Sequence, residues 1–306
     1  MRAAQIVELG GTPRPAEIED REGMEVLAVA LNPLDLAVAA GRYYAGHPPL
    51  PYVPGCEAVA RRGGERLYLF GEWYGVRRDG FLAERTDFPE EAAVPVPEGL
   101  DDVRAAACGI AGIAAWIPLT RRAPVQPGDR VLVLGATGAV GSIAVQAARL
   151  LGAERVVAAG RDPAKLERAN ELGADAAVRL EADDLAGRLR EACGGEGPTL
   201  VVDPLWGEPV RAAVEAAAPG ARIVNLGQSA GPEATLASGA VRGKQLAILG
   251  HANVALSREE RRQAYLEVAR EVAAGRIVLE VETFPLDEVA EAWAAQARGR
   301  KAVVLL

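Results

Sequence analysis

The stretch VLVLGATGAVGSIAVQAARLLGA, at positions 131–153, carries the most specific chemical pattern in the chain. An apolar run leads into three glycines spaced three apart, and apolar residues at helical spacing follow. The first glycine permits a tight turn, the next lets backbone N–H groups approach a pyrophosphate, and the last lets the helix pack on the strand. The helix N-terminus then presents partial positive charge to the anion. The pattern predicts a dinucleotide site at Gly135, Ala136, Thr137, Gly138, Ala139, Val140 and Gly141. The alternative is a glycine-rich turn that binds nothing.

The end of the following strand, RVVAAG at 155–160, bears on which dinucleotide binds. An acidic residue there would hold the ribose 2′-hydroxyl and repel a 2′-phosphate. This chain instead has Gly160 and Arg161, and Lys165 lies four positions after Arg161, so two cations can converge on one phosphate. Asp162, directly before Pro163, is expected to cap the next helix. NADPH is therefore the favoured cofactor, and a solvated basic pair is the alternative.

A third segment, Asn225, Leu226 and Gly227, follows another short apolar run. We expect these residues to form a wall for the nicotinamide ribose and carboxamide, with Gly227 permitting close approach of the backbone.

The elements that would position these residues alternate between strand and helix from Arg130 to Gly250. Apolar strands alternating with helices of about ten residues are typical of parallel βαβ units in a doubly wound sheet. Residues 1–115 predict a compact β-rich unit, with strands such as AAQIVEL, ERLYLF and FLAERTDF and one helix at Pro33–Gly41. After a charged helix at Arg258–Ala274, the tail predicts a strand IVLEVETF, a helix Leu286–Gln296 and a last strand KAVVLL.

Composition excludes several classes of protein. The 306 residues suggest two cores, and 50% hydrophobic with 25% charged residues excludes extensive disorder. Charged residues or prolines interrupt every apolar run before about 18 residues, so no membrane span is expected. The first residues lack the apolar segment of a secretory signal. A net charge of −8 disfavours nucleic acid and anionic lipid as partners.

The three cysteines, Cys56, Cys108 and Cys193, are widely separated and form no CxxC pair. A disulfide framework and a four-ligand structural zinc are therefore not expected. Reduced thiols in a cytoplasmic protein fit this pattern best.

Several segments, taken in order, resemble one family. They are Asn32-Pro-Leu-Asp35, Ala40-Gly-Arg-Tyr43, LPYVPGCEAVA, GIAAW, the glycine-rich stretch above, GRDPAKLERANELGAD, APGARIVNLG, FPLDEVAEAW and GRKAVVLL. Together they resemble the medium-chain dehydrogenase/reductase superfamily, in its zinc-free, zeta-crystallin-type quinone oxidoreductase branch. The resemblance implies an α/β protein: a GroES-like β-rich catalytic domain, residues 1–115 and 257–306, and a Rossmann dinucleotide-binding domain, residues 116–256. It also implies a homodimer that pairs through the edge strand QLAILG.

The resemblance also bears on zinc. The zinc ligands of metal-dependent relatives align with Asn32, Cys56 and approximately Ile110, of which only the cysteine is a good ligand. No metal site is therefore predicted, and metal-assisted alcohol oxidation is disfavoured.

Quinones and activated C=C bonds are electron-poor, so they accept hydride without a metal. The resemblance assigns a hydrogen-bonding role near nicotinamide or substrate to Asn32. It assigns a donor or proton-relay role to Tyr43, with Tyr52 in the pocket wall. A turn-capping amide and simple packing are the alternatives for these residues.

The leading hypothesis is an NADPH-dependent reductase of a small-molecule quinone or enone. The competing hypothesis is an NADPH-binding protein with a sensing or partner-binding role and little turnover.

Overall fold

The computed structural model describes all 306 residues, which divide into two compact units. Unit 1 comprises Met1–Ala111, Ser257–Gly275 and Leu279–Leu306. Unit 2 comprises Gly112–Leu256 and Arg276–Val278. No helix combines the length and the apolar character needed to cross a bilayer.

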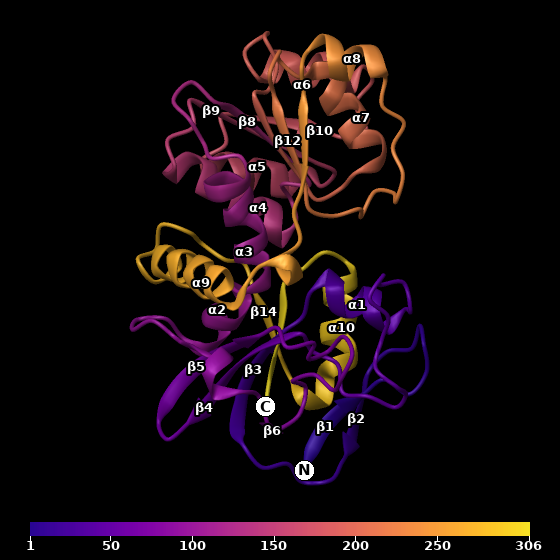
Figure 1. Ribbon diagram of the computed structural model, residues 1–306, viewed down its shortest axis with the longest axis vertical. Helices are drawn as coiled ribbons and strands as arrows, with labels where there is room; N and C mark the ends of the chain where they lie inside the picture. Colours follow the sequence, from indigo (N-terminus) through magenta and orange to yellow (C-terminus); the bar gives the residue numbers. More distant parts are fainter. The chain divides into compact units, whose positions relative to one another are not determined.

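Unit 2 contains a sheet of six parallel strands in the order β10-β9-β8-β11-β12-β13 (Figure 1). The strands are β8 (Arg130–Leu134), β9 (Arg155–Gly160), β10 (Ala176–Arg179), β11 (Leu200–Asp203), β12 (Arg222–Asn225) and β13 (Ala247–Gly250). The central strands are continuous apolar runs, as expected where helices cover both faces. This order is the doubly wound arrangement that the sequence predicts, and it confirms the α/β fold class.

The helices of unit 2 are α4 (Ala139–Leu150), α5 (Pro163–Glu171), α6 (Leu185–Ala192), α7 (Gly207–Ala216) and α8 (Ser238–Gly243). The boundary between the units falls within α3 (Ile110–Ile117), and a π-helix, Pro118–Arg122, follows it. One face of the sheet forms an apolar core with α6 and α7. Helix α4 contacts β8 and β9, and helix α5 contacts β9 and β10.

Unit 1 is built on a mainly antiparallel sheet in the order β14-β15-β3-β4-β5-β7, with β6 paired to β3 (Figure 1). Its strands are β3 (Met24–Ala30), β4 (Glu57–Arg62), β5 (Glu65–Phe70), β6 (Arg85–Thr86), β7 (Val94–Pro95), β14 (Glu282–Pro285) and β15 (Ala302–Leu305). A separate pair joins β1 (Arg2–Gln5) to β2 (Arg14–Glu17). The helices are α1 (Pro33–Ala39), α2 (Asp102–Ala107), α9 (Arg258–Ala273) and α10 (Val289–Ala297). The β-rich character predicted for the N-terminal part is confirmed.

Three predicted strands are wrong in extent, and FLAERTDF forms a strand only at Arg85–Thr86. The run IVLEVETF forms a strand only at Glu282–Pro285. At Val278, the Gln146 side chain takes the place of a neighbouring strand: its Nε2 donates to the Val278 carbonyl at 3.0 Å and its Oε1 accepts the Val278 N–H at 2.8 Å. The run AAQIVEL ends as a strand at Gln5, after which Ile6 exchanges two backbone hydrogen bonds with Tyr52.

Helices α2, α3 and α8 were not expected from the sequence. The N-terminus of α2 carries a recognisable signal, because the Asp101 carboxylate accepts the Arg104 N–H at 2.7 Å. The three consecutive alanines of α2 provide little helical periodicity in hydrophobicity, so the segment was not recognised as a helix.

Candidate functional site

The glycine turn between β8 and α4 is held close to its neighbouring strands. Gly135 has φ of +63°, a conformation that glycine adopts without strain. The Ala136 N–H donates to the Ala159 carbonyl at 2.9 Å, which ties the turn to β9. A Cβ at Gly135 would lie 3.0 Å from Leu205 Cδ2, in the loop after β11. The turn therefore lies where the chain direction reverses across the sheet, the place at which such sheets bind ligands.

The start of α4 suits an anion. A Cβ at Gly141 would lie 2.2 Å from the Gly135 carbonyl oxygen, so only glycine lets the helix approach the turn this closely. The N-cap residue is Gly138, and no side chain caps the helix. The aspartates Asp162 and Asp184 cap α5 and α6. The α4 N-terminus thus has no internal carboxylate to satisfy its first N–H groups, which a phosphate would do.

Gly160, at the end of β9, lies close to the glycine turn. A Cβ there would lie 2.5 Å from Thr137 Cγ2 in the glycine turn. Arg161 follows directly and is exposed, and Lys165 lies in the first turn of α5. The prediction that Asp162 caps this helix is confirmed, because its Oδ1 accepts the N–H groups of Ala164 at 3.0 Å and Lys165 at 3.3 Å.

The wall predicted at Asn225, Leu226 and Gly227 lies at the carboxyl end of β12. The Asn225 amide donates to Asp203 Oδ2 at 3.0 Å and to the Gly227 carbonyl at 2.8 Å. Burial raises the pKa of Asp203, and its other oxygen accepts two backbone N–H groups of the loop after β11. A Cβ at Gly227 would lie 2.5 Å from the Pro204 carbonyl oxygen, so this glycine permits close approach of the two strand ends. Contact of these three residues with a nucleotide stays a prediction.

In unit 1, Asn32 belongs to a buried polar network that was not expected from the sequence. Its Nδ2 donates to Glu57 Oε1 at 2.8 Å and to the Ala30 carbonyl at 3.1 Å. Its Oδ1 accepts from the Lys301 ammonium at 2.8 Å, and Lys301 also lies 3.1 Å from Glu57. Both amide hydrogens of the Asn32 side chain are used inside the protein. Its predicted contact with nicotinamide or substrate is untested.

Glu57 is fully buried at the centre of this network. Its Oε2 accepts from the Tyr68 hydroxyl at 2.8 Å and from the Ile110 N–H at 2.5 Å. The Tyr68 ring stacks on Tyr265 with centroids 3.9 Å apart. The cost of burying the Glu57 carboxylate is therefore offset by one ammonium and three neutral hydrogen-bond donors.

Asp35 is a second buried carboxylate near this network. Its two oxygens accept the N–H groups of Asn32 and Cys56, each at 2.8 Å. Burial raises the pKa of Asp35 to about 6, against the lowering effect of these hydrogen bonds. Asp35 therefore joins the start of α1 to the segment that carries Cys56 and, four residues before it, Tyr52.

The two predicted tyrosines differ in environment. Tyr52 is 1% exposed, and its hydroxyl has no hydrogen-bond partner. Tyr43 is partly exposed, and its hydroxyl lies 3.2 Å from that of Tyr44. Burial raises the pKa of both phenols, so both stay protonated and able to donate.

The donor set of unit 1 does not fit a tetrahedral zinc. Structural and catalytic zinc sites take several ligands from Cys, His and carboxylates. Around Asn32 the oxygens are already held by the Lys301 ammonium, and Cys56 has a raised pKa that disfavours the thiolate. No group of three or more His, Cys, Asp and Glu side chains is arranged to hold a metal.

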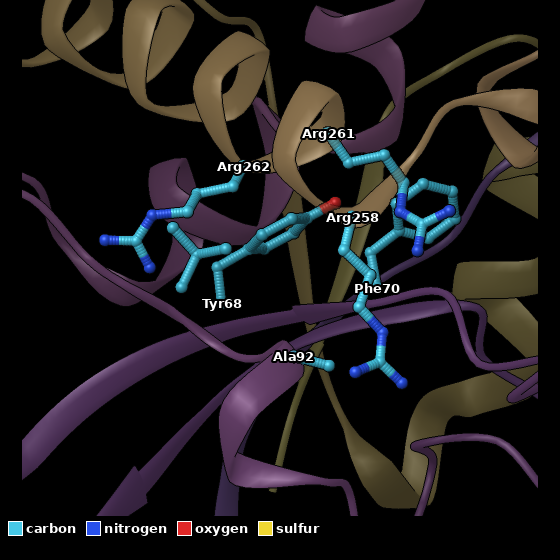
Figure 2. A pocket seen from close by; sticks show the side chains of 7 residues that line it. Tyr68, Phe70, Ala92, Arg258, Arg261 and Arg262 are labelled. Atoms are coloured by element: carbon cyan, nitrogen blue, oxygen red, sulfur yellow. The ribbon is translucent and has the colours of Figure 1, made fainter.

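Unit 1 also has a small surface pocket between α9 and the edge of the sheet (Figure 2). It is lined by Tyr68, Phe70, Ala92, Val94, Arg258, Arg261 and Arg262. Two of the guanidinium groups are already engaged, because Arg258 donates twice to Glu72 at 2.9 Å and Arg261 lies 5.7 Å from the Phe70 ring centroid. The pocket contains none of the predicted site residues.

The sequence did not predict that Lys301 and Tyr68 donate to Glu57, or that Asp35 accepts two backbone N–H groups. The chain has only three lysines among 34 basic residues, and this rarity was a signal for Lys301 as well as for Lys165. No local spacing pointed to Tyr68.

A glycine turn at the reversal point of a parallel sheet, joined in one chain to a β-rich unit, defines a nucleotide-dependent oxidoreductase of the dehydrogenase type. Comparison with known proteins narrows the class. The family model described as "Zinc-binding dehydrogenase" matches residues 139–271. The quinone oxidoreductase of Thermus thermophilus, whose structure was also determined with NADPH, is 32% identical over the full length of both chains, with a TM-score of 0.82. The chain belongs to the medium-chain dehydrogenase/reductase superfamily, in its quinone oxidoreductase-like branch.

Other similarities show the breadth of this family. A structure titled NAD-dependent alcohol dehydrogenase is 28% identical over both full chains, with a TM-score of 0.89. A phenolphthiocerol/phthiocerol polyketide synthase of Mycobacterium tuberculosis is 31% identical over 95% of this chain, which spans 13% of the length of that relative. The protein is thus an NAD(P)-dependent oxidoreductase by family.

Proposed function

We propose that this protein uses NADPH to reduce a quinone or an enone, without a catalytic zinc. The observation that carries the proposal is the end of β9. Gly160 carries no carboxylate at the position that would hold a ribose 2′-hydroxyl, and the cationic Arg161 and Lys165 follow. The uncapped start of α4 supports a pyrophosphate beside it.

A bound NADPH would supply the hydride that the electron-poor acceptor takes up. Reduction leaves negative charge on an acceptor oxygen, which a neutral hydrogen-bond donor stabilises. The Tyr52 hydroxyl is the best candidate donor, because leaving it buried and unpartnered costs about 1–3 kcal/mol. Tyr43 is the second candidate, and we propose Asn32 as a positioning residue through its bonds to Glu57 and Lys301.

The proposal is tested by following oxidation of NADPH and NADH with a panel of simple quinones and enones, in the presence of a metal chelator. We expect turnover with NADPH, a higher KM for NADH, and no effect of the chelator. Loss of activity on chelation, together with stoichiometric zinc in the purified protein, would overturn the zinc-free mechanism.

A second candidate, an NADPH-binding protein with little turnover, is favoured by one observation. Both amide hydrogens of Asn32 are used internally, so the residue has no spare donor for a substrate. Tight NADPH binding without turnover of any acceptor would support this alternative and contradict the reductase proposal.

A further inference from the structure

We infer that Arg179, at the end of β10, binds the 2′-phosphate of NADPH together with Arg161 and Lys165. This inference rests on the proposed function and deepens it, because it names a residue that sets the choice between NADPH and NADH. Arg179 was not singled out from the sequence, where it lies 18 positions after Arg161.

The strand register places Arg179 directly beside Gly160. In the parallel pair β9–β10, the Cα partner of Arg179 is Gly160. The next residue, Leu180, donates its N–H to the Gly160 carbonyl at 2.9 Å, so the pairing continues to the end of the strand. Neighbouring strands lie only about 4.8 Å apart, which an arginine side chain easily spans.

The side chain of Arg179 lies on the face of the sheet that the phosphate site requires. Val178 contributes to the core that packs against α6 and α7, so the next residue points to the opposite face. Residues that are paired across two neighbouring strands have their side chains on the same face of the sheet. A Cβ at Gly160 would point towards Thr137 of the glycine turn and Leu166 of α5. Arg179 therefore shares the face of the glycine turn and of the helix that carries Lys165.

Nothing in the protein uses the Arg179 guanidinium. The residue is exposed, and it forms no ion pair and no side-chain hydrogen bond. Many other arginines on this surface are paired, such as Arg149 with Asp175 and Arg168 with Glu171. Asp162, the acidic residue next to Arg161, is occupied by two backbone N–H groups of α5. A guanidinium at the carboxyl edge of the sheet without an internal partner is well suited to a phosphate.

The test compares binding of NADPH and NADH to the full chain and to the variant Arg179→Ala, by calorimetry at low salt. We expect the Kd for NADPH to rise about tenfold, since the lost contact is a charge-assisted one, while the Kd for NADH is unchanged. The fragments 2′,5′-ADP and 5′-ADP should show the same contrast, which assigns the loss to the 2′-phosphate. Arg179→Gln should behave like Arg179→Ala, and it serves as the second variant if the alanine variant folds poorly.

The matched control is Arg188→Ala on α6, where the guanidinium donates to the Asp183 carbonyl at 3.0 Å. It removes the same charge from the same unit and should leave the ratio of the two Kd values unchanged. If wild-type protein prefers NADPH and Arg179→Ala keeps that preference, the inference about Arg179 is wrong and the proposed function stands. If the wild-type protein binds neither nucleotide, the proposed function fails and the inference fails with it.

Discussion

Ionisation of the buried Asp35 carboxyl opposes folding. Burial raises its pKa to about 6 from an ordinary value of 3.8, although two backbone N–H groups stabilise the carboxylate. The folded state therefore binds a proton more tightly than the unfolded state does. As pH rises from about 4 to about 6, this group lowers the free energy of unfolding by about 3 kcal/mol, and the loss is constant at higher pH.

We predict that the variant Asp35→Asn will gain stability relative to the wild type as pH rises through this window. The amide cannot ionise, so the variant has a fixed cost for its altered hydrogen bonds and none for a buried charge. Urea unfolding at several pH values measures the difference in free energy of unfolding, in which other titrating groups cancel. A difference that is flat from about pH 4 to about pH 7 would show that Asp35 titrates normally.

At the scale of elements, the contact between α4 and the glycine turn decides whether the nucleotide site forms. We predict that Gly141→Ala destabilises the protein by about 1–3 kcal/mol, because the new Cβ would meet two backbone positions that have no room to yield. The atoms concerned are the Gly135 carbonyl oxygen at 2.2 Å and Ala136 Cα at 2.6 Å. Displacement of α4 should also weaken NADPH binding by at least about tenfold, since the N–H groups of its first turn move.

Gly138→Ala in the same turn is the control for stability. Its Cβ would lie 3.5 Å from the Gly135 carbonyl oxygen, an ordinary contact, so its free energy of unfolding should stay close to that of the wild type. Equal stability of the two variants, measured by urea unfolding, would contradict the close packing assigned to Gly141.

Elements with strong local patterns were predictable from the sequence. Strands β8 and β9 and helix α9 lie within a residue or two of their expected bounds, and α5 begins directly after its expected cap, Asp162, because apolar runs and caps act over a few residues. The segment at Val278 was not predictable, since its hydrogen bonds come from Gln146, 132 positions earlier. The α2 segment lacked a helical pattern for a different reason, because its last three residues are all alanine and give no periodicity in hydrophobicity.

The candidate site likewise has a part that the sequence predicts and a part that it does not. The glycine turn and Gly160 lie in contiguous motifs, so their types and spacing predicted the geometry that the structure shows. The network of Asn32, Glu57 and Lys301 joins residues up to 269 positions apart. No local pattern could reveal that the Lys301 ammonium donates to both Asn32 and Glu57.

At the scale of the whole molecule, β13 is an open edge of the parallel sheet. It pairs only with β12, and the N–H groups of Ala247 and His251 are used in that pairing. Backbone N–H groups along a strand point alternately to one side and the other, so the N–H groups of Ile248 and Gly250 point away from β12. Ile248 is also 37% exposed. We propose that this edge pairs with a second copy of the chain to form a homodimer.

We predict a dimer at micromolar concentration in sedimentation equilibrium, and a shift towards monomer for Ile248→Pro. Proline removes the outward N–H while leaving the bonds to β12 intact. The variant Ile248→Ala retains that N–H and should remain more dimeric. A wild-type monomer across the micromolar range would refute this interface.

The position of β15 has a consequence for how the chain is made. This strand lies between β14 and β3 in the sheet of unit 1, and its neighbour Lys301 supplies the only ammonium at Glu57. A ribosome has therefore translated all of unit 2 before Ala28–Ala30 of β3 can pair with β15, although β6 already pairs with Met24 and Glu25 on the same edge. Until then Glu57 has no counter-charge and part of one edge of β3 is unpaired, so nascent unit 1 exposes free backbone hydrogen-bonding groups for much of its synthesis. Unit 2, whose sheet is encoded by one uninterrupted stretch, has no such wait.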